Sequence, residues 1–218
     1  MKPDLRIKES LLCLTRDAPD CSHFRQVEKL VHAGASFIQL RSKSVPENQL
    51  LEESKSAVIL AKQNGSKLII NDHYELTKDV EADGVHLGVS DAPVEFVRDY
   101  LPRGKIIGKT VHSFEEAKIA VKEQPDYIGL GPIRNSITKK ELTPCLSDEE
   151  FKEIAALLHP IPVFLIGGLN RNDFDLIDRI HVQGICLCSD LSLDQNDTTH
   201  LYEIVQKSRA FETALHSL

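Results

Sequence analysis

The stretch KIIGKTVHSFEEAKIAVKEQPDYIGLG, residues 105–131, contains two apolar runs separated by a polar segment, and this arrangement decides the fold. The runs KIIGKT (105–110) and YIGLG (127–131) are continuous rather than alternating, which is typical of parallel strands covered on both faces. The segment between them, SFEEAKIAVKEQ (113–124), spaces its apolar residues near the helical period of about 3.6. The stretch therefore predicts a strand, a helix and a second strand parallel to the first.

The same pattern recurs along the whole chain. Another helical segment, PENQLLEESKSAVILAKQNG (46–65), begins with Glu47 after a proline and reaches a glycine stop at Gly65. Eight strand-helix units fit the length of a (β/α)8 TIM barrel, whereas an open doubly wound sheet more often uses about five to seven strands. No linker or change of composition divides the chain, so an α/β fold with one TIM-barrel domain over residues 1–218 is predicted. The eight apolar runs are LLCLT (11–15), FIQLR (37–41), KLIIN (67–71), GVHLG (84–88), KIIGKT, YIGLG, PVFLIGG (162–168) and GICLCS (184–189).

The composition restricts the class of partner. The chain has 218 residues, 41% of them hydrophobic, and a formal net charge of -7, so its surface gives no general attraction to nucleic acid or anionic lipid. The first residues lack the apolar core of a signal peptide, and no run approaches the roughly 18 apolar residues of a membrane span. A cytoplasmic protein with small-molecule ligands is expected, without nucleic-acid or membrane partners, and homo-oligomer formation stays open.

In such a barrel the chemistry lies at the C-terminal ends of the strands, so the residues that follow each run are the candidates. Cationic and hydroxyl side chains follow the second, fifth and sixth runs, and acidic side chains follow the third and fourth. Each group also fits a purely structural role. The Asn-Asp pair could cap a helix, the histidine could be a core residue with its hydrogen bonds satisfied, and the Ser-Lys-Ser segment could be an ordinary solvated turn. The candidates are Gln39, Arg41, Lys43, Asn71, Asp72, His86, Asp91, Lys109, Thr110 and His112, then the loop GLGPIRNSITKK (129–140), and finally Gly168 and Ser189.

This division of charge indicates phosphate chemistry. Guanidinium, ammonium and hydroxyl donors suit the oxygens of a polyphosphate, and two carboxylates from different strand ends suit Mg²⁺, which binds one or two carboxylates together with substrate phosphates. The pair Gly167-Gly168 allows backbone N–H groups to approach a second, smaller phosphate after the seventh strand. Two anion sites in one cavity suggest the joining of two phosphorylated fragments, or transfer of a group from a diphosphate. The polyphosphate donors are Arg41, Lys43, Thr110, Ser136, Thr138 and Lys139, and the candidate metal ligands are Asp72 and Asp91.

Six motifs, found over roughly residues 11–190, resemble those of the thiamine phosphate synthase (thiamine-phosphate pyrophosphorylase) family in order and spacing. The resemblance implies a TIM-barrel transferase of thiamine biosynthesis. It would couple 4-amino-5-hydroxymethyl-2-methylpyrimidine diphosphate with 4-methyl-5-(2-phosphoethyl)thiazole by a Mg²⁺-assisted dissociative substitution, giving thiamine phosphate and diphosphate. The motifs are QLRSK, IINDHYEL, ADGVHLGVSD, IGKTVHS, DYIGLGPIRNSITKK and IPVFLIGGLN.

The resemblance also implies residue roles. Catalytic roles fall to Arg41, Lys43, Thr110 and Lys139, and metal binding to Asp72 and Asp91. The substrate-binding residues would be Gln39 and Arg41 at the pyrimidine and its diphosphate, Lys43 and Asn71 at the diphosphate, His86 beside the pyrimidine, Thr110, Ser136, Thr138 and Lys139 around the diphosphate, and Gly168, Cys188 and Ser189 at the thiazole phosphate.

The chain departs from the family pattern at several positions. Ser42 replaces a usual glutamate, Arg134-Asn135 replace an aromatic-proline pair, Lys109 adds a charge beside Thr110, and PCLS (144–147) replaces a glycine-containing segment. Two alternatives remain open. One is the related thiazole tautomerase, which has a histidine where this chain has Pro132. The other is a non-catalytic paralogue that binds phosphate ligands.

Overall fold

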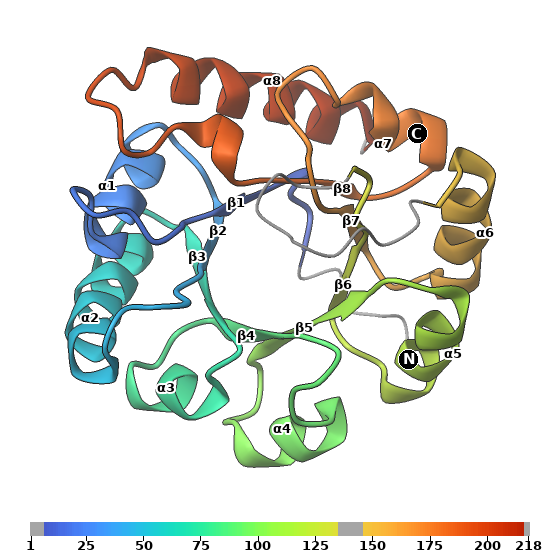
Figure 1. The fold of residues 1–218 in the computed structure, drawn as a ribbon, viewed down its shortest axis with the longest axis horizontal. Helices are drawn as coiled ribbons and strands as arrows, with labels where there is room; N and C mark the ends of the chain where they lie inside the picture. Colours follow the sequence, from blue (N-terminus) through green and yellow to red (C-terminus); the bar gives the residue numbers. More distant parts are fainter. Residues whose placement is uncertain (1–6, 135–145, 216–218) are drawn as a thin grey trace.

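The eight predicted strands close into a barrel. The computed structural model describes residues 7–134 and 146–215, and Figure 1 shows a ring of strands enclosed by a ring of helices. Every strand is parallel to its neighbours, and β1 pairs with both β2 and β8, through Cys13 opposite Ile38 and Leu187. The (β/α)8 prediction is therefore confirmed. The strands are β1 (Leu11–Leu14), β2 (Phe37–Leu40), β3 (Lys67–Asn71), β4 (Gly84–Leu87), β5 (Ile106–Val111), β6 (Tyr127–Leu130), β7 (Val163–Leu165) and β8 (Gly184–Leu187).

A helix follows each strand. The expected boundaries of the second helix are confirmed, since Pro46 is its N-cap and Gly65 lies just beyond its end with φ of 71°. Ser147 caps α6 through a capping box with Glu150, which satisfies N–H groups that a helix start leaves without partners. The helices are α1 (His23–His32), α2 (Glu47–Gln63), α3 (Tyr74–Asp79), α4 (Val94–Tyr100), α5 (Phe114–Glu123), α6 (Asp148–Leu158), α7 (Asp175–Ile180) and α8 (Thr199–Leu215), and a short 3₁₀ helix η1 (Ser189–Leu191) follows β8.

The strands bury different residues on their two faces. On β3, Leu68 and Ile70 belong to the apolar layer between the sheet and the helices, and Ile69 belongs to a separate cluster inside the barrel. The interior is filled by three aromatic rings, with the Phe37 centroid 5.4 Å from Tyr127 and 5.7 Å from Phe164. Offset and edge-to-face contacts of this kind are the favoured geometries for packed aromatic rings. The barrel therefore has an apolar floor.

Polar side chains lie one step beyond this floor, toward the C-terminal ends of the strands. Because side chains on one face of a strand recur every second residue, Gln39 follows Phe37 and Asn71 follows Ile69 on the inner face. Gln39, Asn71 and His86 are all buried. Burial of polar groups is costly unless they are paired, so a polar layer on top of an apolar core indicates a site.

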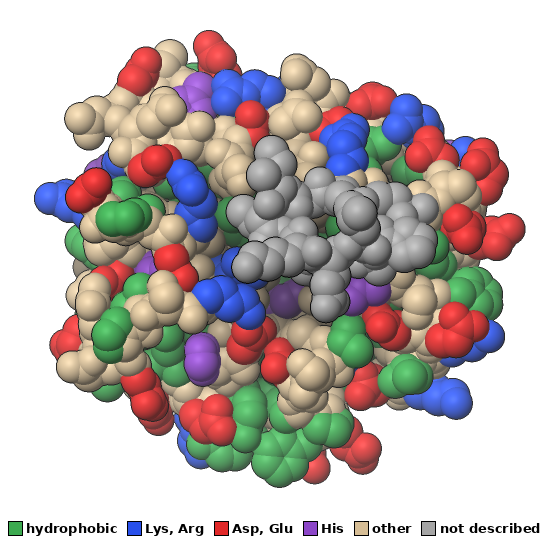
Figure 2. Space-filling view, viewed as in Figure 1, with side chains coloured by type: hydrophobic (Ala, Val, Ile, Leu, Met, Phe, Trp, Pro, Cys, Tyr) green, Lys and Arg blue, Asp and Glu red, His purple; other side chains and the backbone are tan. Residues whose placement is uncertain are grey.

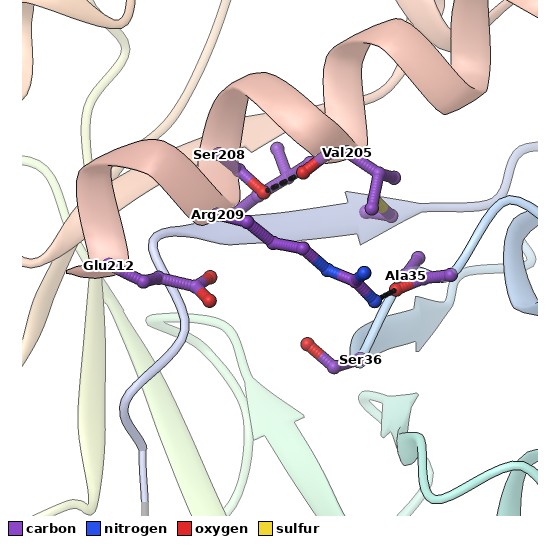
Figure 3. A pocket seen from close by; sticks show the side chains of 9 residues that line it. Ala35, Ser36, Val205, Ser208, Arg209 and Glu212 are labelled. Atoms are coloured by element: carbon purple, nitrogen blue, oxygen red, sulfur yellow. Dashed lines mark hydrogen bonds between the residues drawn. The ribbon is translucent and has the colours of Figure 1, made fainter.

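Structural contacts join α8 to the starts of β1 and β2, on the outer face of the sheet. A cavity of about 10 Å³ lies between them, with room for about one water molecule. Figure 3 shows the side chains that line it. There the Arg209 guanidinium donates to the Gly34 carbonyl at 3.0 Å, and the Ser10 hydroxyl donates to the Ser208 carbonyl at 2.9 Å. No helix in the described ranges, 7–134 and 146–215, combines the length and apolar character of a membrane span.

Candidate active site

Charged side chains from three successive strand ends meet at the mouth of the barrel. Lys43, after β2, places Nζ 3.0 Å from Oδ2 of Asp72, after β3. The Asp72 carboxyl in turn contacts that of Asp91, which follows β4. Figure 2 shows basic and acidic side chains side by side on this face, near the ends of β2, β3 and β4. The structure thus brings together three candidates that are far apart in the sequence.

The two carboxylates form a site of concentrated negative charge. Burial raises the pKa of Asp91, and the nearby charge of Asp72 raises it further, while a hydrogen bond from the Gly88 N–H at 2.5 Å and the charge of Lys43 oppose the shift. Like charges held this close favour a cation between them, and hard divalent cations prefer carboxylate oxygens. Among the described residues, no three His, Cys, Asp or Glu side chains lie close enough together to hold a metal ion. A cation at this carboxylate pair would need further ligands from a substrate.

The backbone conformation at Asp72 orients its carboxylate. Asp72 has φ of 63°, in the left-handed region, where Asp and Asn are the non-glycine residues best tolerated. Its N–H donates to the His86 carbonyl at 2.8 Å, which extends the pairing of β3 with β4 by one residue. The chain therefore turns out of β3 at Asp72 while remaining attached to the neighbouring strand.

Asn71 carries a polar group without a partner. It is 6% exposed, and its buried Nδ2 has no hydrogen-bond partner among the described residues. An unsatisfied buried donor costs roughly 1–3 kcal/mol. Such a donor, directly before Asp72 and inside the polar layer, is available to a ligand oxygen.

His86 is fixed at the centre of the polar layer. Its Nδ1 lies 2.9 Å from the Tyr127 hydroxyl, and its Nε2 lies 2.9 Å from Thr110 Oγ1. Burial lowers the pKa of His86 to about 4, opposed by the charge of Asp72 and assisted by Arg41. The imidazole is therefore uncharged at neutral pH. It presents to a ligand a flat ring held by two hydrogen bonds, and not a positive charge.

This burial predicts acid sensitivity. Because the pKa of His86 in the folded protein is about 4 and that of an unfolded histidine is about 6.5, the unfolded state binds more protons between these values. We expect this contribution to the free energy of unfolding to be complete above pH 6.5 and to decline by roughly 3 kcal/mol as the pH falls to 4. Urea unfolding between pH 4 and 7 measures the slope. In a His86→Asn variant, the free energy of unfolding should depend less steeply on pH, by a slope equivalent to about one proton. An unchanged slope would contradict the lowered pKa of His86.

The charge of Arg41 acts on residues at two separate strand ends. Its positive charge lowers the pKa of His86 on β4, and it opposes the rise in pKa that burial causes at Cys188, just after β8. Arg41, directly after β2, is therefore near enough for its charge to affect groups at the ends of both β4 and β8.

The loops after β6, β7 and β8 are joined by two arginine pairs. Arg134 donates to Asp173 through both terminal nitrogens, at 2.8 and 2.6 Å, and to the Gly168 carbonyl at 3.1 Å. Arg171 similarly bonds Asp190 through its backbone N–H at 2.9 Å and its Nε at 3.0 Å. Gly168, Cys188 and Ser189 lie at these joined strand ends, on the other side of the mouth from the carboxylate pair.

Close packing of the loops requires glycine at positions 167 and 168, whether or not a ligand binds there. Both have positive φ, 90° and 67°, and a Cβ on Gly167 would lie 2.6 Å from Pro132 Cβ. A Cβ on Gly168 would lie 2.7 Å from Arg134 Cβ. The two glycines thus let the β6 and β7 loops approach each other.

The Arg134 pair predicts a measurable effect on stability. The bidentate bond lowers the pKa of Asp173, which is 7% exposed, whereas about half of the Arg134 side chain is exposed. We expect Arg134→Ala to lower the free energy of unfolding by about 1 kcal/mol, because it leaves Asp173 with fewer donors. Arg134→Lys keeps the charge but loses the fork and should recover only part of that loss. Urea unfolding of both variants measures the difference, and two variants as stable as the unaltered protein would contradict it.

Three sequence-based candidates, Ser136, Thr138 and Lys139, lie outside the described residues. Another, Lys109, does not face the mouth. It lies within β5 between Gly108 and Thr110, both of which face His86, so Lys109 points outward, and its Nζ lies 3.6 Å from Glu123 of α5. The expectation that Lys109 adds charge beside Thr110 at the strand end is wrong, because adjacent strand residues point to opposite faces.

Two further groups were missed by the sequence analysis. Tyr127 reads as an apolar strand residue, yet its hydroxyl bonds both His86 and Gln39. Asp17 lies in the loop that follows the first strand, and this position was the available signal. His112, by contrast, was one of the sequence-based candidates. It donates from Nδ1 to the Gly131 carbonyl at 2.5 Å and so holds the chain where it leaves β6.

Fold and site together define a (β/α)8-barrel protein whose mouth combines a carboxylate pair, basic side chains and a buried polar layer. The family model described as thiamine monophosphate synthase matches residues 11–191. The chain belongs to this family.

Individual relatives agree with this assignment. The thiamine-phosphate synthase of Phocaeicola vulgatus is 37% identical over 76% of this chain and 82% of that protein. The protein of the same name from Bacteroides thetaiotaomicron is 31% identical over 92% of this chain and 98% of its own length. Among solved structures, thiamine phosphate pyrophosphorylase from Pyrococcus furiosus superposes with a TM-score of 0.82 and 28% identity, covering 96% of this chain and 99% of that one.

Proposed function

We propose that this protein is a thiamine-phosphate synthase. It would couple 4-amino-5-hydroxymethyl-2-methylpyrimidine diphosphate with 4-methyl-5-(2-phosphoethyl)thiazole, releasing diphosphate. The observation that carries the proposal is the cluster of Lys43, Asp72 and Asp91 beside the buried Asn71 Nδ2, which has no hydrogen-bond partner among the described residues. This combination of a cation, two hard oxygen ligands and a buried donor suits a metal-bound diphosphate better than an uncharged ligand.

Mg²⁺ is the metal that these residues fit. Asp72 and Asp91 would hold it from the protein side. Burial, and after it the charge of Asp72, raise the pKa of Asp91, and a bound cation would relieve the repulsion between the two carboxylates. Two carboxylates with substrate oxygens completing the shell are the usual protein environment of Mg²⁺. When bound, the ion supplies charge neutralisation for the departing diphosphate.

The chain's own residues orient the substrates for substitution at the pyrimidine methylene carbon. The carbon-oxygen bond breaks, its electron pair leaves with the diphosphate, and the thiazole nitrogen lone pair forms the new carbon-nitrogen bond. Arg41 and Lys43 stabilise the negative charge that grows on the diphosphate, and Lys139 would do so by family resemblance. No side-chain nucleophile or proton transfer is needed, which agrees with an uncharged His86 beside the reacting ring.

The second substrate would bind on the opposite side of the mouth. The Arg134 pair joins the loops after β6 and β7, and the Arg171 pair joins the loops after β7 and β8. In these loops Gly168 and Ser189 are exposed, and Cys188 is partly buried. A phosphate in this region is the usual arrangement in barrels of this type. Arg41, whose charge affects groups at the ends of both β4 and β8, would separate the two anions.

The proposal extends to the whole chain. We propose that residues 1–218 act as one domain in the cytoplasm on these small molecules. The net charge of -7 supports this, because it gives no general attraction to nucleic acid or anionic lipid.

A direct assay tests the function. Purified protein is incubated with both substrates and Mg²⁺, and thiamine phosphate and diphosphate are measured by chromatography in equal amounts. Isomerisation of the thiazole without coupling would instead identify a tautomerase. Binding of substrate without any product would identify a non-catalytic paralogue.

A further inference from the structure

The loop that follows β2 is held by Asp17, a carboxylate from the loop between β1 and α1. Its Oδ2 accepts from the Lys43 backbone N–H at 2.8 Å and from the Ser44 hydroxyl at 2.9 Å. Its Oδ1 accepts from the Ser42 hydroxyl and from His23 Nε2, both at 3.0 Å. A carboxylate has about four acceptor positions, so these contacts fill it.

A second set of hydrogen bonds connects the same carboxylate to Arg41. The Arg41 backbone N–H donates to Thr15 Oγ1 at 3.0 Å, and Thr15 Oγ1 lies 2.7 Å from His23 Nδ1. The Asp17 carboxylate can only accept, so His23 Nε2 carries the ring proton and donates to it. In that tautomer Nδ1 is the acceptor, and the Thr15 hydroxyl donates to it. Thr15 and His23 are 0% and 1% exposed, so the link between Arg41 and Asp17 is shielded from water, whereas Asp17 itself is partly exposed.

The charge of Asp17 is stable and works against anion binding. Burial would raise the pKa of Asp17, but the hydrogen bonds from Lys43, His23, Ser44 and Ser42 outweigh burial and lower the pKa to about 2. A permanent negative charge beside a basic loop weakens the attraction of that loop for phosphate. The negative charge of Asp17 would therefore not help the loop to bind phosphate. Its role is the loop geometry that its hydrogen bonds impose.

We infer that Asp17 is a positioning residue, which sets the backbone of residues 41–44 so that Arg41 and Lys43 face the substrate diphosphate. The inference rests on the proposed function for the identity of the substrate. It differs from that function because Asp17 acts through other residues: all four of its hydrogen bonds go to the protein. Positioning groups of this kind typically change ligand affinity or activity by about 10- to 100-fold when removed.

The test compares Asp17→Ala and Asp17→Asn with Asp20→Ala, which removes an exposed carboxylate three residues further along the same loop. Steady-state kinetics give the KM of each substrate, and calorimetry gives the affinity for inorganic diphosphate with Mg²⁺. Asp17→Ala should raise the KM for the pyrimidine diphosphate and weaken diphosphate binding by about 10- to 100-fold, with the KM for the thiazole phosphate within about twofold. Asp17→Asn keeps an oxygen for the Lys43 N–H and should be intermediate, and Asp20→Ala should match the unaltered protein.

Each other outcome has a definite meaning. If Asp17 acted only through its charge, both Asp17 variants would bind diphosphate more tightly, which would overturn the inference. An equal rise in both KM values would overturn it too, because it would indicate general disruption. If Asp17→Ala fails to fold in a thermal melt, the same criteria apply to Asp17→Asn. An unaltered protein that binds diphosphate without coupling the substrates would refute only the proposed function, and one that does not bind diphosphate would refute both.

Discussion

Asp72→Asn is expected to lower kcat/KM for coupling by about 10³-fold, equivalent to about 4 kcal/mol of transition-state stabilisation. The change removes one of two carboxylates that face each other at the mouth, and with it half of the proposed Mg²⁺ site. Asparagine is the suitable replacement because residue 72 has φ of 63°, which Asn tolerates and Ala does not. The loss should persist at high Mg²⁺ concentration, and initial rates over a Mg²⁺ titration measure it.

The folded state should not suffer from the same substitution. Asp72 raises the pKa of Asp91, so removing its charge relieves a repulsion, and the half-exposed ion pair with Lys43 contributes little to stability. Thermal melts should therefore show an equal or higher Tm. Asp79→Asn is the matched control, because it makes the same change at an exposed position at the end of α3. Full activity in Asp72→Asn would remove Asp72 from the mechanism.

Gly108→Ala is expected to disrupt both the fold and the site. A Cβ on Gly108 would lie 2.2 Å from Tyr127 Cζ and 2.5 Å from His86 Nδ1, inside a filled interior where the two rings are bonded to each other. Overpacking of this kind costs about 3 kcal/mol, or a Tm lower by roughly 10 °C for a chain of this length. His86 would also be displaced from Thr110, so coupling activity should fall with stability.

Gly129→Ala provides the graded comparison. It also faces His86, but its added Cβ would lie 3.2 Å from His86 Cε1 and 3.4 Å from Ile166, distances that small shifts accommodate. We expect a loss of at most about 1 kcal/mol. Melting temperature and kcat measured on both variants test the contrast, and equal behaviour of the two would show that the His86 position tolerates movement.

Several local features were predictable because neighbouring residues determine them. The eight continuous apolar runs all form strands, since a parallel strand buried on two faces must be apolar throughout. The start of α2 at Glu47 and its end before Gly65 follow from proline and glycine backbone preferences. Because closure of eight strand-helix units brings all strand ends to one mouth, Lys43, Asp72 and Asp91 could be grouped before the structure was known.

Other features depend on which face a residue occupies. Lys109 and Thr110 are adjacent in the sequence, but only Thr110 faces the interior, and Lys109 pairs with Glu123 in the helix layer. Tyr127 looks like a strand residue and nothing more until the barrel places it under His86. Register decides these cases, because a shift of one residue moves a side chain to the opposite face.

The amino-acid sequence by itself determined the barrel, the order of its units, the family and the set of polar residues at the strand ends. Hydrophobic periodicity and turn preferences act over a few residues, so they can be read along the chain. Only the tertiary structure decided that Asp17 accepts from the backbone of the 41–44 loop, that Arg134 pairs with Asp173, and that Asn71 Nδ2 has no partner within residues 7–134 and 146–215. These outcomes depend on hydrogen bonds of about 3 Å between segments separated by tens of residues, and such distances exist only once the barrel has closed.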